Sequence, residues 1–144
     1  MYVLDTNVVS ELRKAQAGKG DANVTRWIAS QPPAGLYLSA ITVMELQIGV
    51  LRMDRRDPMQ GALLGAWMQT RVLPAFAGRV LPVDQVVALR CAQLHADTPR
   101  AERDALIAAT ALVHSMGVAT RNTVDFETTG VQLVNPWTRE DKAT

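Results

Sequence analysis

Four acidic residues of this sequence lie in otherwise apolar surroundings, where a carboxylate without a partner is costly. They are Asp5, Glu45, Asp104 and Asp125. Carboxylates that folding brings together repel one another, and a bound divalent cation relieves that repulsion. Ligand sets made only of oxygen select hard ions such as Mg²⁺, which leaves part of its coordination shell to water and phosphate oxygens. The chemistry implied is hydrolysis of a phosphodiester bond, and the spacing leaves open whether one or two ions bind.

The surroundings of two of these acids indicate where they lie. Asp5 ends the apolar run Tyr2–Leu4, which is typical of a buried parallel strand, and such strands present ligands just beyond their carboxyl ends. Glu45 has Ile41 and Ile48 as its helical neighbours, so we expect it on a buried or half-buried helix face. Both acids are therefore expected near the same edge of a sheet.

An alternative interpretation pairs each acid with a nearby arginine. Asp104 has Arg100 at helical spacing, and Asp125 has Arg121 four residues before it. Glu11, which lies one to two helical turns beyond the first strand, could face either the site or solvent. For a single acid the ion pair is as reasonable as a metal ligand, and only the set of four favours a common site.

The apolar runs and the helix-capping residues predict an α/β fold. Strands are predicted over residues 2–4, 36–38, 80–83, 118–120 and 131–134. Helices are predicted over residues 6–13, 24–30, 40–52, 58–73, 85–95 and from the Thr98–Pro99 pair to near residue 117. Residues 15–23 are predicted to form a loop. Strands that alternate with helices favour a parallel sheet of about five strands with helices on both faces.

Composition narrows the class of protein. A chain of 144 residues is of ordinary size for one domain, and its single cysteine excludes an internal disulfide. The net charge of +1 gives no attraction of the whole molecule for nucleic acid, so such binding needs a local patch. We see no apolar run long enough to cross a membrane and no signal peptide, and we therefore expect a soluble cytoplasmic protein.

Five segments carry motifs that can be read together. They are Asp5–Leu12, Thr42–Leu46, Asp104–Ala111, Thr120–Phe126 and Asn135–Trp137. In this order the chain resembles the PIN-domain nucleases, and within them the FitB-like branch of the VapC toxins. The resemblance covers nearly the whole chain and implies a single PIN domain over residues 1–144, with a PIN-like three-layer sandwich built on a five-stranded parallel sheet.

The resemblance also implies roles for individual residues. Asp5, Glu45 and Asp104 match the three core acids, and Asp125 matches the fourth acidic position of this branch. Many relatives carry an aspartate where this chain has Asn122, so either Asn122 or Asp125 completes the site, and we favour Asp125 as the charged ligand. Groups that would orient the carboxylates or a water are Thr6, Asn7, Thr120 and Asn122. Arg121 is the basic residue best placed to contact a phosphate.

The activity implied is that of an endoribonuclease dependent on Mg²⁺ or Mn²⁺, the toxin of a type II toxin–antitoxin system. Its expected partners are RNA, a cognate antitoxin of the VapB or FitA type and a second copy of the chain. One alternative is a PIN module that binds RNA or the antitoxin without catalysis. A less favoured one is a phosphatase with Asp5 as covalent nucleophile, because such enzymes usually carry a second aspartate where this chain has Asn7.

Overall fold

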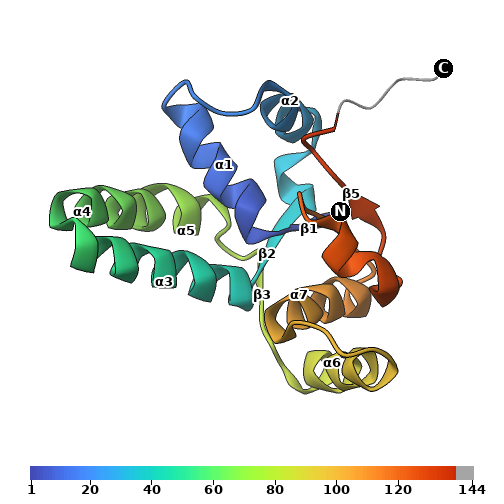
Figure 1. Cartoon of the computed structure of the whole chain (residues 1–144). Coiled ribbons are helices and arrows are strands. Elements are labelled where there is room, and N and C mark those ends of the chain that lie inside the picture. The colour runs from blue at the N-terminus through green and yellow to red at the C-terminus, as the bar shows by residue number, and fades with distance from the viewer. Residues whose placement is uncertain (139–144) are drawn as a thin grey trace.

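A computed structural model of the chain describes residues 1–138 and is built on a five-stranded parallel sheet in the order β3-β2-β1-β4-β5. The strands are β1 (Tyr2–Leu4), β2 (Leu36–Ser39), β3 (Val80–Leu81), β4 (Gly117–Ala119) and β5 (Leu133–Val134). Helices cover both faces of this sheet (Figure 1). The predicted α/β fold with a parallel sheet is confirmed, and β1 lies at its centre between β2 and β4.

The described residues form seven α-helices. They are α1 (Thr6–Gln16), α2 (Ala22–Ser30), α3 (Ala40–Arg56), α4 (Pro58–Trp67), α5 (Leu73–Ala75), α6 (Gln85–Asp97) and α7 (Glu102–Val113). Short 3₁₀ helices occupy Pro33–Gly35 and Thr123–Thr129. The side chains that cap helix N-termini are those of Asp5, Asp21, Ser39, Asp57 and Asp84. Each accepts a hydrogen bond from a backbone N–H that has no partner inside its helix.

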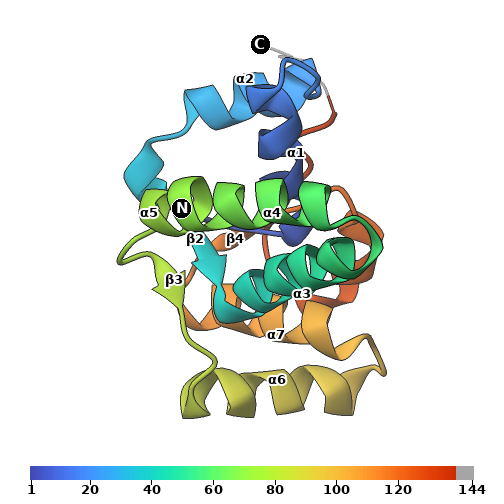
Figure 2. The same cartoon turned by 90° about the vertical axis from the view of Figure 1, so that its left-hand side faces the viewer.

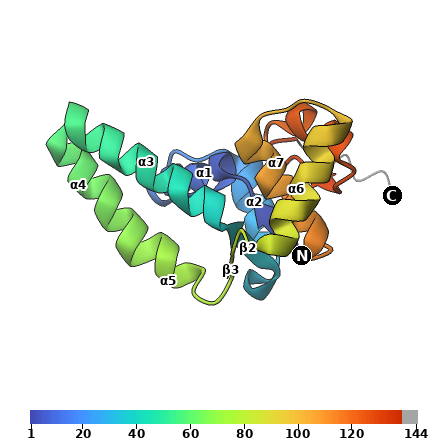
Figure 3. The ribbon, with the colours of Figure 1, turned by 90° about the horizontal axis from the view of Figure 1, so that it is seen from below.

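Two layers of helices bury the two faces of the sheet. Neighbouring strand residues point to opposite faces, so Val3 and Val118 pack with α6 and α7, whereas Leu4 and Ala119 pack on the side of α1 and α3. Figure 2 shows α6 and α7 beneath the sheet. Figure 3 shows α3 and α4 side by side, extending away from it. Because β1 and β4 are buried on both faces, packing fixes the carboxyl ends of these strands, which Asp5 and Thr120 follow.

The last long helix begins later than predicted. Thr98 ends α6, with its N–H donating to the Leu94 carbonyl, and α7 starts only at Glu102. The residue before a proline is forced toward extended backbone, and Thr98 accordingly has φ −152° and ψ 126°. The prediction that Pro99 opens the helix is therefore wrong, because Thr98–Ala101 forms the connection between two helices.

Two other boundaries also differ from prediction. The loop predicted over residues 15–23 is shorter, because α1 continues to Gln16 and α2 begins at Ala22. The helix predicted over residues 58–73 is interrupted by a π-helical segment, Met68–Val72, before α5. The N–H of Leu73 donates to the Met68 carbonyl, five residues back, and Pro74 has no N–H with which to restore the α-helical pattern.

The described part of the chain bears on two further predictions. None of the helices within residues 1–138 is long and apolar enough to cross a membrane. The single domain was predicted to reach residue 144, and residues 139–144 lie outside the described residues. Cys91 is buried on α6, where burial raises the pKa of its thiol.

Candidate active site

Asp5 lies where the central strand β1 passes into α1, and its side chain is 6% exposed. Its backbone N–H donates to the Ala119 carbonyl, so the end of β1 is tied to the end of β4. The Thr6 N–H donates to Asp5 Oδ1 over 2.8 Å, and the Thr120 hydroxyl donates to Asp5 Oδ2 over 2.7 Å. Both donors are neutral. Burial raises the pKa of Asp5 and these hydrogen bonds oppose the rise, while the charges of Glu45 and Asp125 add to it.

Glu45 lies on α3, the helix that follows β2. The Thr6 hydroxyl donates to Glu45 Oε1 over 2.8 Å, so one threonine contacts two of the four acids. Arg103 Nη1 lies 3.7 Å from Glu45 Oε2, and the Glu45 side chain is 25% exposed. The expected half-buried position is confirmed. Its cationic partner comes from α7, which the sequence spacing gave no means to find.

Asp104 lies in the first turn of α7, where the partial positive charge of a helix N-terminus favours an anion. Burial raises the pKa of Asp104 to about 6, and the charges of Asp5, Asp125 and Glu45 add to the rise in that order. Each of the other three acids is therefore close enough to oppose ionisation of Asp104. The four acids come from separate segments of the chain and share one electrostatic environment.

Asp125 and Asn122 both belong to the segment that follows β4. Asn122 precedes the 3₁₀ helix Thr123–Thr129, and its backbone N–H donates to the Thr120 hydroxyl over 3.0 Å. Asp125 is exposed, and its negative charge raises the pKa of both Asp5 and Asp104. The choice of Asp125 over Asn122 as the fourth ligand stays a prediction.

Within residues 1–138 the alternative ion pairs are not formed. Neither Asp104 with Arg100 nor Asp125 with Arg121 makes a salt bridge there, and the pairs present are Glu45 with Arg103 and Glu11 with Lys14. Among these same residues, no group of three acidic, histidine or cysteine side chains is close enough, as it stands, to enclose a metal ion. Within the described residues the acids therefore do not form a closed metal site.

Asn7 links the acids to Arg121. Its Nδ2 donates to Asp5 Oδ2 over 3.4 Å, and its Oδ1 accepts from the Arg121 backbone N–H over 3.3 Å. The Arg121 guanidinium stacks on Trp137, with Cζ 5.3 Å from the centroid of the ring. The sequence singled out Asn7 and Arg121, but not the contribution of Trp137 from beyond β5.

Glu11 takes neither of the two orientations that the sequence left open. It is buried at the junction of α1 and α2, where its Oε1 accepts from the Asp21 N–H over 2.9 Å. Lys14 Nζ lies 3.5 Å from Glu11 Oε2. Glu11 therefore ties α1 to the start of α2, and these contacts include none of the four acids.

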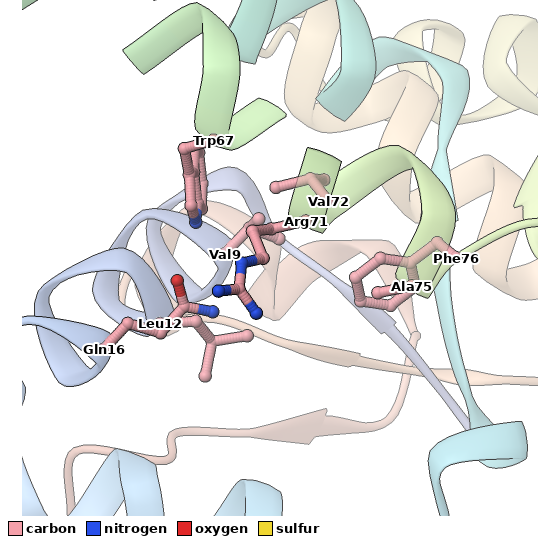
Figure 4. A pocket seen from close by; sticks show the side chains of 8 residues that line it. All are labelled: Val9, Leu12, Gln16, Trp67, Arg71, Val72, Ala75 and Phe76. Carbon is pink, nitrogen blue, oxygen red and sulfur yellow. The ribbon is translucent and has the colours of Figure 1, made fainter. Parts of the chain in front are cut away.

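A pocket lies between α1 and the α4–α5 segment (Figure 4). Its lining residues are Val9, Leu12, Gln16, Trp67, Arg71, Val72, Ala75 and Phe76. Its volume of about 60 Å³ is far below that of ordinary small-molecule sites, and none of the four acids lines it. The Trp67 indole nitrogen points into it and has no acceptor within the described residues. The pocket is distinct from the acidic region.

Sequence reasoning missed three residues that contact the predicted ones. Arg103 pairs with Glu45, and Trp137 stacks with Arg121. The fully buried Thr42 places its hydroxyl 3.4 Å from that of Thr6. Thr42 lies one helical turn before Glu45, so helical spacing from a predicted acid is the signal that could have found it, whereas Arg103 and Trp137 carry no such signal.

The fold and these residues define a class of α/β proteins with an acidic site at the carboxyl edge of a parallel sheet. Residues 2–131 match the PIN domain family. The chain is 46% identical to VapC ribonuclease Y4jK of Sinorhizobium fredii, over 95% of this chain and 98% of that protein. It is 41% identical to Toxin FitB of Neisseria gonorrhoeae, over 95% of this chain and 99% of the toxin.

A solved structure shows the same fold. The chain in the crystal structure of FitAcB from Neisseria gonorrhoeae is 38% identical and matches with a TM-score of 0.87, over 96% of this chain and all of that one. The chain therefore belongs to the PIN domain family, on the branch that contains the VapC and FitB toxins.

Proposed function

We propose that this protein is a metal-dependent endoribonuclease and the toxin of a type II toxin–antitoxin system. The observation that carries the proposal is the mutual effect of the four acids: burial raises the pKa of Asp104, and the charges of Asp5, Asp125 and Glu45 add to that rise. A set of carboxylates that oppose one another's ionisation is stabilised by a cation of high charge. The relatives named VapC ribonuclease and Toxin FitB support the same activity.

The donor set fits a hard divalent cation. All four candidate ligands are carboxylates, and the groups that hydrogen-bond to two of them are hydroxyls and an amide rather than thiols or imidazoles. Asp5, Glu45, Asp104 and Asp125 would hold Mg²⁺ or Mn²⁺. When bound, the ion would neutralise charge on a phosphate and acidify a water near it.

The residues of the chain itself prepare this site. Thr6 contacts both Asp5 and Glu45, and Thr120 holds the other oxygen of Asp5, so these two threonines fix the first two carboxylates relative to each other. Asn7 holds Asp5 from a third direction. Such contacts orient ligands and limit the freedom that binding an ion would otherwise remove. Asn122, through its backbone, keeps the Thr120 hydroxyl in place.

The substrate we propose is RNA with single-stranded character, and Arg121 is the residue that we assign to a phosphate. A net charge of +1 provides no general attraction for nucleic acid, so local cations must supply it. Arg121 is exposed and its backbone is anchored to Asn7 beside Asp5. Its backbone therefore lies beside Asp5, and we assign its guanidinium to a phosphate that approaches the acids.

The partners we propose are a cognate antitoxin of the VapB or FitA type and a second copy of the chain. Structures similar to this chain include FitAB and a toxin–antitoxin complex from Klebsiella pneumoniae. We assign the protein to the cytoplasm, with one PIN domain over its whole length.

Two other functions are weaker. A phosphatase with Asp5 as nucleophile lacks the second aspartate, since Asn7 occupies that position and spends its side chain on Asp5 and Arg121. A module that binds RNA without cleaving it would need no acidic site. It would be favoured if the protein bound RNA and gave no turnover with any divalent cation.

The test is RNA cleavage by the purified protein with Mg²⁺ or Mn²⁺, with chelator and with Asp5→Asn. We expect cleavage that requires the ion and the Asp5 carboxylate. We also expect Mn²⁺ to raise the melting temperature, because an ion that binds only the folded state stabilises it by about 2.7 kcal/mol at a hundred times its dissociation constant. Cleavage that survives both the chelator and Asp5→Asn would sink the proposal.

A further inference from the structure

Arg121 and Trp137 form a cation–π pair at the carboxyl edge of the sheet, where Arg121 follows β4 and Trp137 follows β5. The Arg121 Cζ atom lies 5.3 Å from the centre of the Trp137 ring. A guanidinium over an aromatic face is attracted to the negative face of the ring and lies flat against it. The pair therefore presents a planar cation at one position rather than a mobile side chain.

The backbone of Arg121 is tied to the acidic region by hydrogen bonds. Its N–H donates to Asn7 Oδ1 over 3.3 Å, and Asn7 Nδ2 donates to Asp5 Oδ2 over 3.4 Å. Thr120, the residue before Arg121, donates directly to Asp5. The position of the Arg121 backbone relative to Asp5 is thus set by two independent contacts.

Trp137 is held in place by packing of its ring against the core and by hydrogen bonds of its backbone. It packs against the core cluster that contains Leu4 and Ala119. Its carbonyl accepts from Asn23 Nδ2 over 2.9 Å, and its N–H donates to Asn135 Oδ1 over 3.0 Å. A ring fixed in this way can orient the guanidinium that lies on it.

Arg79 and Phe76 form a second arginine–aromatic pair, and this pair has a structural role. Arg79 Cζ lies 5.7 Å from the Phe76 ring centroid, and its guanidinium donates to the carbonyls of Leu36 and Ala75 over 2.9 and 2.6 Å. The Arg121 guanidinium has no acceptor among the described residues, and the residue is exposed. Its donors are available to an external acceptor, whereas those of Arg79 are used within the fold.

We propose that Trp137 is a positioning residue that holds the Arg121 guanidinium ready to bind a phosphate of the RNA beside the four acids. The inference rests on the proposed function and assigns Trp137 a role through Arg121. A planar guanidinium binds phosphate oxygens through two parallel N–H donors, which requires a fixed orientation. Stacking supplies that orientation before the RNA arrives, so less freedom is lost on binding.

The test is RNA binding, measured in an Asp104→Asn background that keeps the RNA intact. The probe is a short fluorescein-labelled single-stranded RNA of mixed sequence, followed by anisotropy in Mg²⁺ at several salt concentrations. We expect Arg121→Gln to weaken binding roughly tenfold and to lower the salt slope by about 0.7. We expect Trp137→Leu to weaken binding about threefold and Trp137→Phe to restore most of the loss.

The double variant decides how Trp137 acts. If Trp137 works through Arg121, Arg121→Gln with Trp137→Leu binds RNA no more weakly than Arg121→Gln alone. Losses that add would show that Trp137 contacts RNA itself and would overturn the proposal. A lowered melting temperature for Trp137→Leu with unchanged RNA affinity would equally overturn it, because the residue would then be only structural.

Trp27→Leu is the matched control for the loss of a packed indole. Trp27 packs against the same core cluster and meets Tyr2 edge to face at 5.3 Å, with no arginine on it. We expect this variant to lose stability and keep its RNA affinity. A parent protein that neither binds nor cleaves RNA would contradict the proposed function itself, whereas a parent that does both, with Trp137→Leu unchanged, would contradict only the role of Trp137.

Discussion

Two buried carboxylates of the first helix and its cap have opposite surroundings. Asp5 is 6% exposed and Glu11 is 8% exposed. Glu11 accepts from the Asp21 N–H and has Lys14 at 3.5 Å. Asp5 has only neutral donors, and its charged neighbours Glu45 and Asp125 are themselves acids.

This difference separates a structural carboxylate from a functional one. A buried charge is tolerated where a cation and hydrogen bonds compensate it, as at Glu11. At Asp5 burial raises the pKa, its hydrogen bonds oppose the rise and the neighbouring negative charges add to it, so the compensation must come from outside the chain. Burial alone would have placed the two residues in one category, and the sign of the neighbouring charges distinguishes them.

The largest expected effect is on catalysis at Asp5. Asp5→Asn should lower the rate of RNA cleavage roughly 10²–10³-fold, because it removes a charge that the proposed site needs in the transition state. The metal-free variant should unfold at the same or a higher temperature, since a buried, repelled charge is gone. Cleavage assays and thermal unfolding in chelator measure both effects. Equal rates of RNA cleavage by Asp5→Asn and by the unmodified protein would contradict a functional role for Asp5 and would remove its distinction from Glu11.

Glu11→Ala should give the reverse pattern. It leaves the Asp21 N–H without its acceptor and is expected to lower the free energy of unfolding by about 2 kcal/mol. The rate of RNA cleavage by the folded protein should stay unchanged, because Glu11 contacts none of the four acids. Urea unfolding combined with cleavage assays at a temperature well below the transition provides the test. A fall in cleavage rate without loss of stability would mean that Glu11 belongs to the site.

The pH dependence of stability sharpens the comparison at Asp104. Its pKa is about 6 in the folded protein and about 3.9 in an unfolded chain, so the folded state binds the extra proton between these values. Without metal, the free energy of unfolding should therefore fall as the pH rises from about 4 to about 6. Because Asp104 is partly exposed, we expect roughly 1 kcal/mol. Asp104→Asn should flatten this slope in chemical denaturation at several pH values, and a slope of the opposite sign would contradict the raised pKa.

The smallest expected effect concerns Arg103, which pairs with Glu45. Arg103 lies 3.7 Å from Glu45 and is half exposed, so its ion pair is weak. Removing its positive charge with Arg103→Gln should tighten Mn²⁺ binding about two- to fivefold. Titration calorimetry with Mn²⁺ measures this. Arg56→Gln is the control, because it removes an arginine from the far end of α3, about 16 Å along the helix from Glu45. A weaker Mn²⁺ affinity for Arg103→Gln would show that Arg103 supports the site rather than competes for it.

Much of the fold could be predicted because its signals are local. Apolar runs placed the strands, and Ser39 and Asp84 marked helix starts that the structure confirms. The start of α7 could not be predicted, because Thr98–Pro99 reads as a helix opening and forms instead the extended end of α6. Its true cap position, Ala101, has no capping side chain that would give it away.

The candidate site was only partly predictable, because the sequence reveals local signals and not contacts between distant segments. Four acids in apolar surroundings, with Thr6 and Asn7 after the first strand, are visible in the residues alone. Arg103 and Trp137 were not found, because neither has a spacing that distinguishes it from a solvent-facing or core residue. Their contacts with Glu45 and Arg121 join segments far apart in the chain.

By itself the sequence determined which side chains could do chemistry and which kind of element carries each, because periodicity and capping act over a few residues. The tertiary structure decided which of those side chains meet. The parallel register of β1 with β4 brings Asp5 to Thr120. Packing of α3 and α7 on the sheet brings Glu45 to Thr6 and Arg103. The partners of a carboxylate depend on how distant segments pack, and its pKa follows from the charge and burial they supply, so Glu11 and Asp5 acquire different roles only in the folded protein.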